Sequence, residues 1–356
     1  MRYLSTFATS VILVLAFGCN PNAKTVVKKI RPIIDTLGFG QYDWQMDSIL
    51  ARIDESDKQD RSEYWSTVIC PHDDYAYAAG LYSRTLAGIR AKTVLMIGVA
   101  HRAKNFDLAD RIILGTHTHW AGPYGKIRVS ALRNDLLNVM QASDFVVHDS
   151  MMALEHSLEA ITPFLQAQNP AVEIIPILVP YMKFADMDRI SEALTEGLAK
   201  IMAAKNLKWG EDIAIVISND AVHYGDEGWG GKNLAPFGSD SLGNAQAREK
   251  DKKIIAECLS EEITTAKIKR FTEYSVQPAD YKEYQWVWCG RYSVPFGMLV
   301  ANKMTLLQKG VAINGKLLDY RTSITNPHIE VSDLGMGHTA PANQHHWVAY
   351  CGIGYK

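Results

Sequence analysis

Four apolar runs of this chain each end in residues that can bind a metal or move a proton. These residues are His72, His101, Asp220 with His223, and Cys289. Ligands of open α/β sheets bind outside the carboxyl ends of the strands, so side chains that follow four strands are expected to meet. Taken singly, each has an ordinary structural interpretation, because histidine and aspartate often occupy turns and free cysteine is commonly buried. Together they predict a site at one edge of a sheet.

Two imidazoles and a thiolate form a three-ligand set that suits Fe(II), Zn(II) or copper and leaves coordination positions open. An open position lets substrate, water or dioxygen reach the metal. A histidine that does not bind the metal can act as general base, and Asp220, just before His223, can fix the orientation of that imidazole. The chain has no C-x-x-C or H-E-x-x-H spacing, so local spacing does not identify the metal.

Other histidines have less specific surroundings. His156 lies in the segment EHSLE, where it is either part of a polar helix face or a group that enters the pocket. His117 and His119 alternate along the chain, so an extended segment would point both the same way and could chelate a metal. An exposed loop is the favoured interpretation of the stretch 115–125.

The elements that must position these residues follow from hydrophobic periodicity. Strands are predicted at 64–70, 93–100, 172–180, 212–218 and 346–356, and helices at 77–89, 152–168, 187–204, 245–269 and 296–308. Strands that alternate with helices predict an α/β fold with a central, mostly buried sheet flanked by helices. No repeat or linker interrupts the pattern, so a single domain is expected at 31–356, and the Gly-rich loop 225–243 is expected to form a lid or site wall.

The N-terminus has the pattern of a bacterial lipoprotein signal. An early arginine precedes a short apolar stretch and the pair Gly18-Cys19. Residues 1–19 are therefore predicted to be a signal peptide, with Cys19 lipidated, and residues 20–30 a tether. An ordinary signal peptide or an anchor helix is the alternative. Asn20, in place of aspartate, favours the outer membrane over the inner, so the domain is expected at the cell envelope, facing the periplasm.

The charge of the chain limits the class of partner that it can bind. The net charge is −2 and no long basic run is present, which argues against nucleic acid. Contact with the membrane is expected only through the lipid anchor, and no protein partner is indicated.

The remaining cysteines are Cys70, Cys258, Cys289 and Cys351. The sequence does not pair them, although an oxidising compartment permits a disulfide such as Cys70–Cys289.

Five motifs, in order and with their spacing kept, resemble those of the Memo-like family, called AmmeMemoRadiSam system protein B in bacteria. PHDDYAYAAGLY resembles the family's PHAGYxYSG, LMIGVAH its LGPSH turn, and EHSLEAITPFLQ its EHSLEVQLPFLQ. ISNDAVHYG resembles SSDFSHYG, and WCGRYSV resembles ICGRxPI. The C-terminal YRTSITN and VAYCGIGY are also similar to family sequences. The resemblance extends from about residue 30 to the C-terminus.

The resemblance implies a single α/β domain similar to class III extradiol dioxygenases, which use non-haem Fe(II) to open catechol rings. It also implies iron or copper binding by two histidines and one cysteine, which correspond to His72, His101 and Cys289. The histidine of the fourth motif corresponds to His223. His156, in the third motif, is implied to line the same pocket.

Three departures from the family pattern bear on the site. Asp73 and Asp74 stand where the family has Ala-Gly, beside Tyr75, and these three residues are predicted to line the substrate pocket. Two carboxylates there would favour a harder metal or a cationic substrate group. Ala100 replaces a serine, and the family's early AGxFYP motif is absent. These differences, with the export signal, indicate a divergent branch whose substrate need not match that of its relatives.

Three functions are compatible with these residues. The first is a non-haem Fe(II) oxidoreductase that acts on a chelating small molecule, with His223, Asp220 and His156 as catalytic groups. The second is a non-catalytic module that binds iron, copper or another ligand and docks a partner. The third is zinc-dependent hydrolysis with Asp73 or Asp74 as base.

Overall fold

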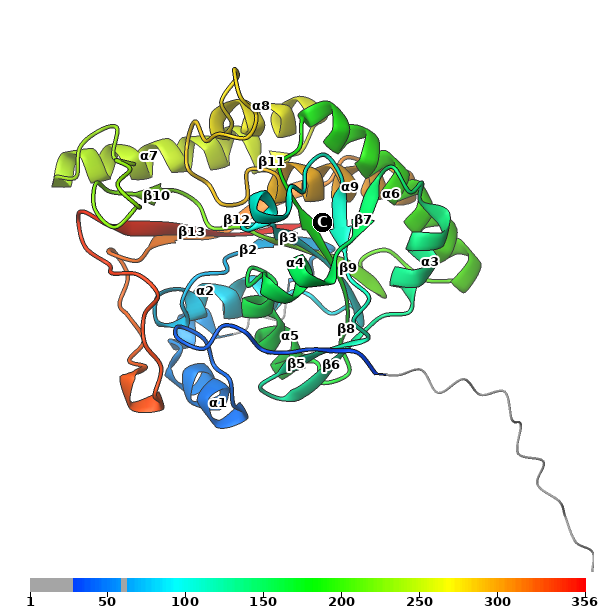
Figure 1. Cartoon of the computed structure of the whole chain (residues 1–356), viewed down its shortest axis with the longest axis horizontal. Helices are drawn as coiled ribbons and strands as arrows, with labels where there is room; N and C mark the ends of the chain where they lie inside the picture. The colour runs from blue at the N-terminus through cyan, green and yellow to red at the C-terminus, as the bar shows by residue number, and fades with distance from the viewer. Residues whose placement is uncertain (1–27, 59–62) are drawn as a thin grey trace, which may run out of the picture.

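The computed structural model describes residues 28–58 and 63–356 and is built around one mixed β-sheet (Figure 1). Its strand order is β1-β5-β6-β8-β3-β9-β2-β13-β12-β11. The strands are β1 Ile30–Arg31, β2 Thr67–Cys70, β3 Thr93–Val99, β4 Ile112–Leu114, β5 His119–Gly122, β6 Gly125–Val129, β7 Phe145–Val147, β8 Glu173–Val179, β9 Ile213–Ser218, β10 His223–Tyr224, β11 Glu261–Glu262, β12 Asn314–Thr322 and β13 Trp347–Tyr355. β6, β8, β3, β9 and β2 run parallel, and β13 and β12 extend the sheet in antiparallel pairing.

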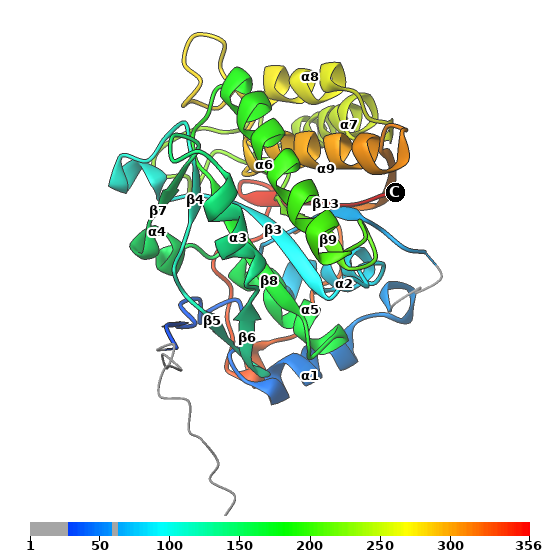
Figure 2. The same cartoon turned by 90° about the vertical axis from the view of Figure 1, so that its right-hand side faces the viewer.

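Helices cover both faces of this sheet, which is why its central strands are buried along their whole length (Figure 2). The helices are α1 Asp43–Arg52, α2 Tyr75–Leu86, α3 Leu132–Val139, α4 Asp149–Leu154, α5 Thr162–Gln168, α6 Phe184–Lys205, α7 Ser241–Cys258, α8 Thr265–Ser275 and α9 Ser293–Lys309. α6 and α9 pack on one face with α3, α7 and α8 around them, while α1, α2 and α5 lie on the other face.

The predicted α/β class and single domain are confirmed. The strands predicted at 64–70, 93–100, 172–180, 212–218 and 346–356 correspond to β2, β3, β8, β9 and β13. The helices predicted at 77–89, 187–204 and 296–308 correspond to α2, α6 and α9. The carboxyl ends of the neighbouring strands β2, β9 and β3 therefore lie together, and the segments that leave them carry His72, Asp220 and His101. The prediction that Cys289 follows a strand is wrong, because the segment before it forms only an isolated bridge between Trp288 and Val222, and Cys289 lies just before α9.

The prediction of one helix over 152–168 is wrong, because α4 ends at Leu154 and Glu155 is extended (φ −94°, ψ 127°). The buried Arg31 guanidinium donates to the carbonyl oxygens of Met152 (2.9 Å) and Glu155 (2.6 Å). These are acceptors that a continuing helix would use internally. A short 3₁₀ turn at Glu159–Ile161 then leads into α5. The segment around His156 is thus a loop that the hydrogen bonds from Arg31 fix in place, and it is not part of a helix face.

Two other predicted boundaries are also wrong. The helix predicted over 245–269 is two helices, because Glu261 takes a left-handed conformation (φ 61°) and the Thr264 side chain caps α8. The exposed loop predicted over 115–125 contains β5 and the turn into β6, where Gly125 has a φ of 97°. This hairpin is part of the sheet edge.

The predicted tether at 20–30 overlaps the folded domain at its end. Ile30 and Arg31 form β1, which pairs parallel with β5, and the Lys29 side chain bonds to Asp149. The predicted signal peptide at 1–19, including Cys19, and tether residues 20–27 lie outside the described residues. Within the described ranges, no helix has the length and apolar character needed to cross a membrane.

We expect replacement of Arg31 to destabilise the fold, because its guanidinium is fully buried and pairs with Glu159. Arg31→Met should lower the free energy of unfolding in urea by about 3–5 kcal/mol, since it leaves a buried carboxylate unpaired. Lys29→Met removes a largely exposed partner of Asp149 and should cost about 1 kcal/mol or less. The double variant with Glu159→Gln should recover part of the loss. Equal midpoints for Arg31→Met and Lys29→Met would contradict this assignment.

Candidate metal centre

His72 follows β2 and is held by β9 and the residues after it. Its backbone N–H donates to Asp220 Oδ1 (2.9 Å), and its Nδ1 lies 2.8 Å from Ser218 Oγ. The Ser218 hydroxyl donates its own proton to the Ser157 carbonyl oxygen, so it must accept from His72 Nδ1–H. This tautomer leaves a lone pair on His72 Nε2, as a metal ligand requires.

Asp220 Oδ2 lies 3.3 Å from this His72 Nε2 in a fully buried position. Burial lowers the pKa of His72 well below its ordinary value, and the nearby imidazoles lower it further. Burial also raises the pKa of Asp220 well above its ordinary value, an effect that Asp73 reinforces. Burial thus favours the uncharged forms of both groups, and a bound cation would favour the ionised Asp220 carboxylate and the lone pair of His72 Nε2 as ligands.

His101, in the turn after β3, is oriented by Glu155. The Glu155 carboxylate accepts from the backbone N–H of His101 and lies 2.8 Å from its Nδ1. Burial by itself raises the pKa of Glu155, but His101 and His156 and the hydrogen bonds bring it down to about 2. The carboxylate is therefore ionised and fixes the proton on Nδ1, so Nε2 is free to bind a metal. Carboxylate–histidine–metal triads have this arrangement.

Cys289 completes a possible three-ligand set. Ligand atoms of His72, His101 and Cys289 all lie within 4.8 Å of one another. The structure thus brings together side chains from three separate segments whose donor types suit a transition metal. Burial raises the pKa of the Cys289 thiol well above its ordinary value, and three carboxylates raise it further. A cation is what would convert this thiol to the thiolate ligand.

His223 and Asp220 form an overlapping set with Cys289. Their ligand atoms also lie within 4.8 Å of one another, and His223 Nε2 is 3.1 Å from the Cys289 sulfur. Burial, with the charges of His101 and His346, lowers the pKa of His223 to about 3. His223 is therefore a neutral imidazole at physiological pH, able to accept a proton or to bind metal.

His156 enters the same centre from the loop between α4 and α5. Its ring centroid lies 5.4 Å from that of His72 and 4.9 Å from that of His101. Burial alone lowers its pKa, but the ion pair with Asp35 (Nδ1 to Oδ2 3.1 Å) and the Glu155 charge raise it to about 9. The metal-free centre thus contains one imidazolium, which can donate a proton. Asp35 was not identified from the sequence, because it lies far from every motif.

The three neighbours of His72 have different surroundings. Asp73 accepts from the Tyr350 hydroxyl (2.7 Å), and burial raises its pKa. Both Asp74 oxygens accept from Thr339, and burial together with Asp73 raises the Asp74 pKa to about 7. Tyr75 packs at right angles to Phe39 and Phe164 in the core, and its hydroxyl donates to the Ala160 carbonyl. Asp74 thus links α2 to the C-terminal loop, and Tyr75 has a packing role.

Trp229 and His346 stand beside the centre and were not predicted as part of it. Their rings stack with centroids 3.8 Å apart, and the Trp229 ring lies 5.4 Å from that of His223. Trp229 belongs to the long loop 225–243, whose Gly-rich composition had suggested a site wall. The sequence identified the loop, but it did not indicate that the Trp229 ring would lie against the centre.

Asp251 stabilises the two segments that carry His223 and Cys289. Its carboxylate accepts from the indole N–H groups of Trp286 and Trp288 (2.7 Å each), from the Tyr320 hydroxyl (3.0 Å) and from the Val222 amide (3.2 Å). Burial raises its pKa to about 6. It therefore fixes the residues that adjoin His223 and Cys289. The sequence predicted a helix over 245–269 but did not indicate this buried acid.

The other cysteines, with His117 and His119, do not join the candidate ligand sets of the described residues. Cys70, Cys258, Cys289 and Cys351 are all free and buried, so the Cys70–Cys289 disulfide considered above does not form. His117 is buried near Asp149 (Nδ1 to Oδ1 3.6 Å), while His119 lies on β5, between β1 and β6. Neither belongs to a metal-binding group among the residues that the structure covers.

Comparison with known proteins identifies relatives of this chain. The family model described as Memo-like protein matches residues 41–339. A MEMO1 family protein of Sulfurisphaera tokodaii is 28% identical over 162 residues, 44% of this chain and 52% of that protein. One of Pyrococcus abyssi is 28% identical over 173 residues, 47% of this chain and 56% of that protein. The chain thus spans about half the length of the curated relatives it matches.

The family match extends over most of the folded domain and includes all three residues of the candidate ligand set, His72, His101 and Cys289. It ends at Thr339, the residue that bonds to Asp74. Sequence motifs, fold and site geometry therefore agree, and the chain belongs to the Memo-like family.

Proposed function

We propose that the centre binds Fe(II) through His72, His101 and Cys289 and serves an oxidation of a small molecule. The observation that supports this most is the convergence of the three ligand atoms within 4.8 Å of one another. Two of the three are already oriented, because Ser218 and Glu155 fix the Nδ1 protons of the two imidazoles. Two nitrogens and one sulfur suit Fe(II), and also zinc or copper.

When bound, Fe(II) would supply open positions for a chelating substrate, such as a catechol, and for dioxygen. The surrounding side chains would balance charge and transfer protons. The His156 imidazolium can donate a proton, the neutral His223 imidazole can accept one, and Asp220 holds the loop that carries His72. Trp229 would limit the access of water from the side of His223.

The carboxylates beside the centre support a cationic occupant. Asp73, Asp220 and Glu155 all act on the Cys289 thiol, so the metal-free site carries an excess of acidic groups. We infer that a divalent metal balances them, and that Asp73 favours a substrate with a cationic group. Asp74 is engaged by Thr339 and does not enter this proposal.

A non-catalytic metal-binding module is the second candidate. The observation that favours it is the overlapping donor set of Asp220, His223 and Cys289. If one metal ion recruits His223 as well as the three proposed ligands, fewer positions stay open for substrate. Tight binding of Cu(I) would fit this candidate, since thiolate and imidazole both suit that ion.

We further propose that the domain is exported and held at the cell envelope by a lipid on Cys19, facing the periplasm. The support is the arrangement of the first residues, with an apolar run that ends at Gly18-Cys19. The small-molecule substrate or metal would then be met outside the cytoplasm. No protein partner is proposed.

Removal of one ligand should lower metal binding. Fe(II)-reconstituted wild type, prepared anaerobically, should hold about one iron per chain, while His72→Ala and Cys289→Ser should bind it at least about tenfold more weakly. Glu155→Gln should weaken binding by about 10- to 100-fold, because the His101 tautomer is no longer fixed. His119→Ala, which alters a histidine outside the centre, is the matched control and should bind normally. Unchanged iron content in His72→Ala would refute the ligand set.

Oxygen uptake separates the two candidate functions. The iron-loaded wild type should consume dioxygen with at least one member of a catechol panel, and His72→Ala should not. Stoichiometric iron or copper without uptake for any catechol would favour the binding module instead. Uptake by wild type and His72→Ala alike would show that the reaction occurs elsewhere.

Metal affinity should rise with pH in a manner that depends on Cys289. Its pKa is raised, so the thiol is protonated in the metal-free protein and each binding event releases that proton. The logarithm of the Co(II) association constant should therefore increase by about one more per pH unit in wild type than in Cys289→Ser. His72, whose pKa is lowered, is already neutral and adds nothing. Titrations between about pH 7 and 8.5 that give equal slopes would contradict thiolate binding.

Lipidation can be tested independently of the metal. In a bacterial host, full-length protein should incorporate a radiolabelled or alkyne-tagged palmitate and fractionate with membranes. Cys19→Ser should lose the label and the membrane association while its folded domain still binds metal. A labelled Cys19→Ser protein, or an unlabelled wild type, would rule out the proposed anchor.

A further inference from the structure

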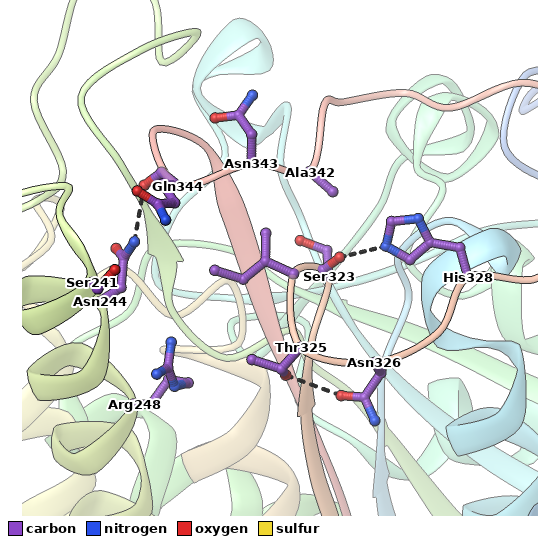
Figure 3. Close-up of a pocket in the computed structure, with 11 residues that line it drawn as sticks. Ser241, Asn244, Arg248, Ser323, Thr325, Asn326, His328, Ala342, Asn343 and Gln344 are labelled. Carbon is purple, nitrogen blue, oxygen red and sulfur yellow. Dashed lines mark hydrogen bonds between the residues drawn. The ribbon is translucent and has the colours of Figure 1, made fainter.

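A cavity of about 690 Å³ lies between α7, the turn after β12 and the segment before β13 (Figure 3). α7 brings Ser241, Asn244 and Arg248 to one side, and the turn brings Ser323, Thr325 and Asn326 to the other. The volume is in the range that holds a small organic molecule. None of the proposed metal-centre residues lines it.

The frame of this cavity is fixed by internal hydrogen bonds. Asn244 accepts from the Trp347 indole (2.9 Å) and donates to the Gln344 carbonyl oxygen (3.2 Å). Ser323 Oγ accepts from the Val348 amide (3.1 Å). Both walls are therefore tied to the start of β13, and the cavity has its shape without a ligand.

Several polar groups that line the cavity take no part in these hydrogen bonds. Among residues 28–58 and 63–356, none forms a hydrogen bond, ion pair or ring contact with the Arg248 guanidinium. Figure 3 draws no hydrogen bond from it to the other lining residues. The same holds for the Ser241 hydroxyl and the Asn326 amide NH₂ group, although Asn326 Oδ1 accepts from Thr325 (3.1 Å). One cation and several neutral hydrogen-bonding groups thus face a common space.

The lining also limits the class of ligand. Among the described residues it contains no Asp or Glu, so nothing there balances the Arg248 charge. Its one aromatic ring among the described residues is the His328 imidazole, which is bonded to the Ser323 carbonyl oxygen (2.6 Å), so it offers little surface for a stacked nucleobase or another aromatic ligand. Hydroxyl and amide groups instead suit a ligand that carries hydroxyl groups. An arginine suits a carboxylate or phosphate.

We propose that this cavity binds a small, hydroxyl-bearing organic anion, of the class of sugar acids and sugar phosphates. Arg248 binds the carboxylate or phosphate, and Ser241 and Asn326 bind hydroxyl groups. The site is distinct from the metal centre but shares a structural element with it. Asn343 and His346 close a tight turn through mutual backbone hydrogen bonds (2.9 and 3.1 Å), with Asn343 in the cavity wall and His346 stacked on Trp229.

Calorimetric titration of the metal-free protein tests the proposal with glucuronate and glucose 6-phosphate as anionic probes. Glucose is the neutral control, and inorganic phosphate reports an adventitious ion. At least one anionic probe should bind with saturable heat, and glucose should bind about tenfold or more weakly. Arg248→Met should weaken anion binding by about 10- to 100-fold. It should keep the wild-type unfolding midpoint, because the side chain has no partner to lose.

Two further variants assign the binding to this cavity. Lys252→Met removes a positive charge from the same helix but lies outside the cavity, so it should bind the probes as wild type does. His72→Ala should also keep binding, which separates this site from the metal centre. Absence of saturable heat up to about 10 mM of either anion, or equal affinity in Arg248→Met, would overturn the proposal. Equal binding of glucose, or binding of inorganic phosphate alone, would overturn the assigned ligand class.

Discussion

The carboxylate of Glu155 connects the fold to the candidate metal centre. It accepts from the backbone and from Nδ1 of His101, and it can do so only because the chain leaves the helical conformation at this residue. Arg31 supports that break by binding the carbonyl oxygens of Met152 and Glu155. The N-terminal strand, the loop that carries His156 and the orientation of His101 therefore depend on one another.

The electrostatics of the centre follow from burial. Histidines become poor bases there, as the lowered pKa values of His72 and His223 indicate, while the Cys289 thiol becomes a poor acid. His156 is the exception, because Asp35 and Glu155 together outweigh the cost of burial and keep it charged. A cation at the centre would lower the pKa of this thiol, so that metal binding would be coupled to the release of its proton.

The sequence predicted the central strands of the sheet, the helices that flank it and the histidines that follow β2 and β3, because apolar periodicity and strand-end chemistry are local signals. It placed Cys289 after a strand that does not form. It did not predict the break at Glu155, since the cause is Arg31, which lies more than a hundred residues away in the chain. Asp251 was missed for a similar reason: its four donors come from distant segments. Asp74 and Tyr75, although next to His72 in sequence, are oriented by packing and not by the site.

The direct test of the account is X-ray absorption at the metal edge of iron-loaded protein prepared without oxygen. If His72, His101 and Cys289 bind the metal, the spectrum of wild type should contain one sulfur scatterer at about 2.3 Å together with imidazole nitrogen or oxygen scatterers at about 2.0–2.2 Å. The sulfur contribution should vanish in Cys289→Ser. A wild-type spectrum with nitrogen and oxygen ligands alone, or a sulfur scatterer that persists in Cys289→Ser, would contradict it.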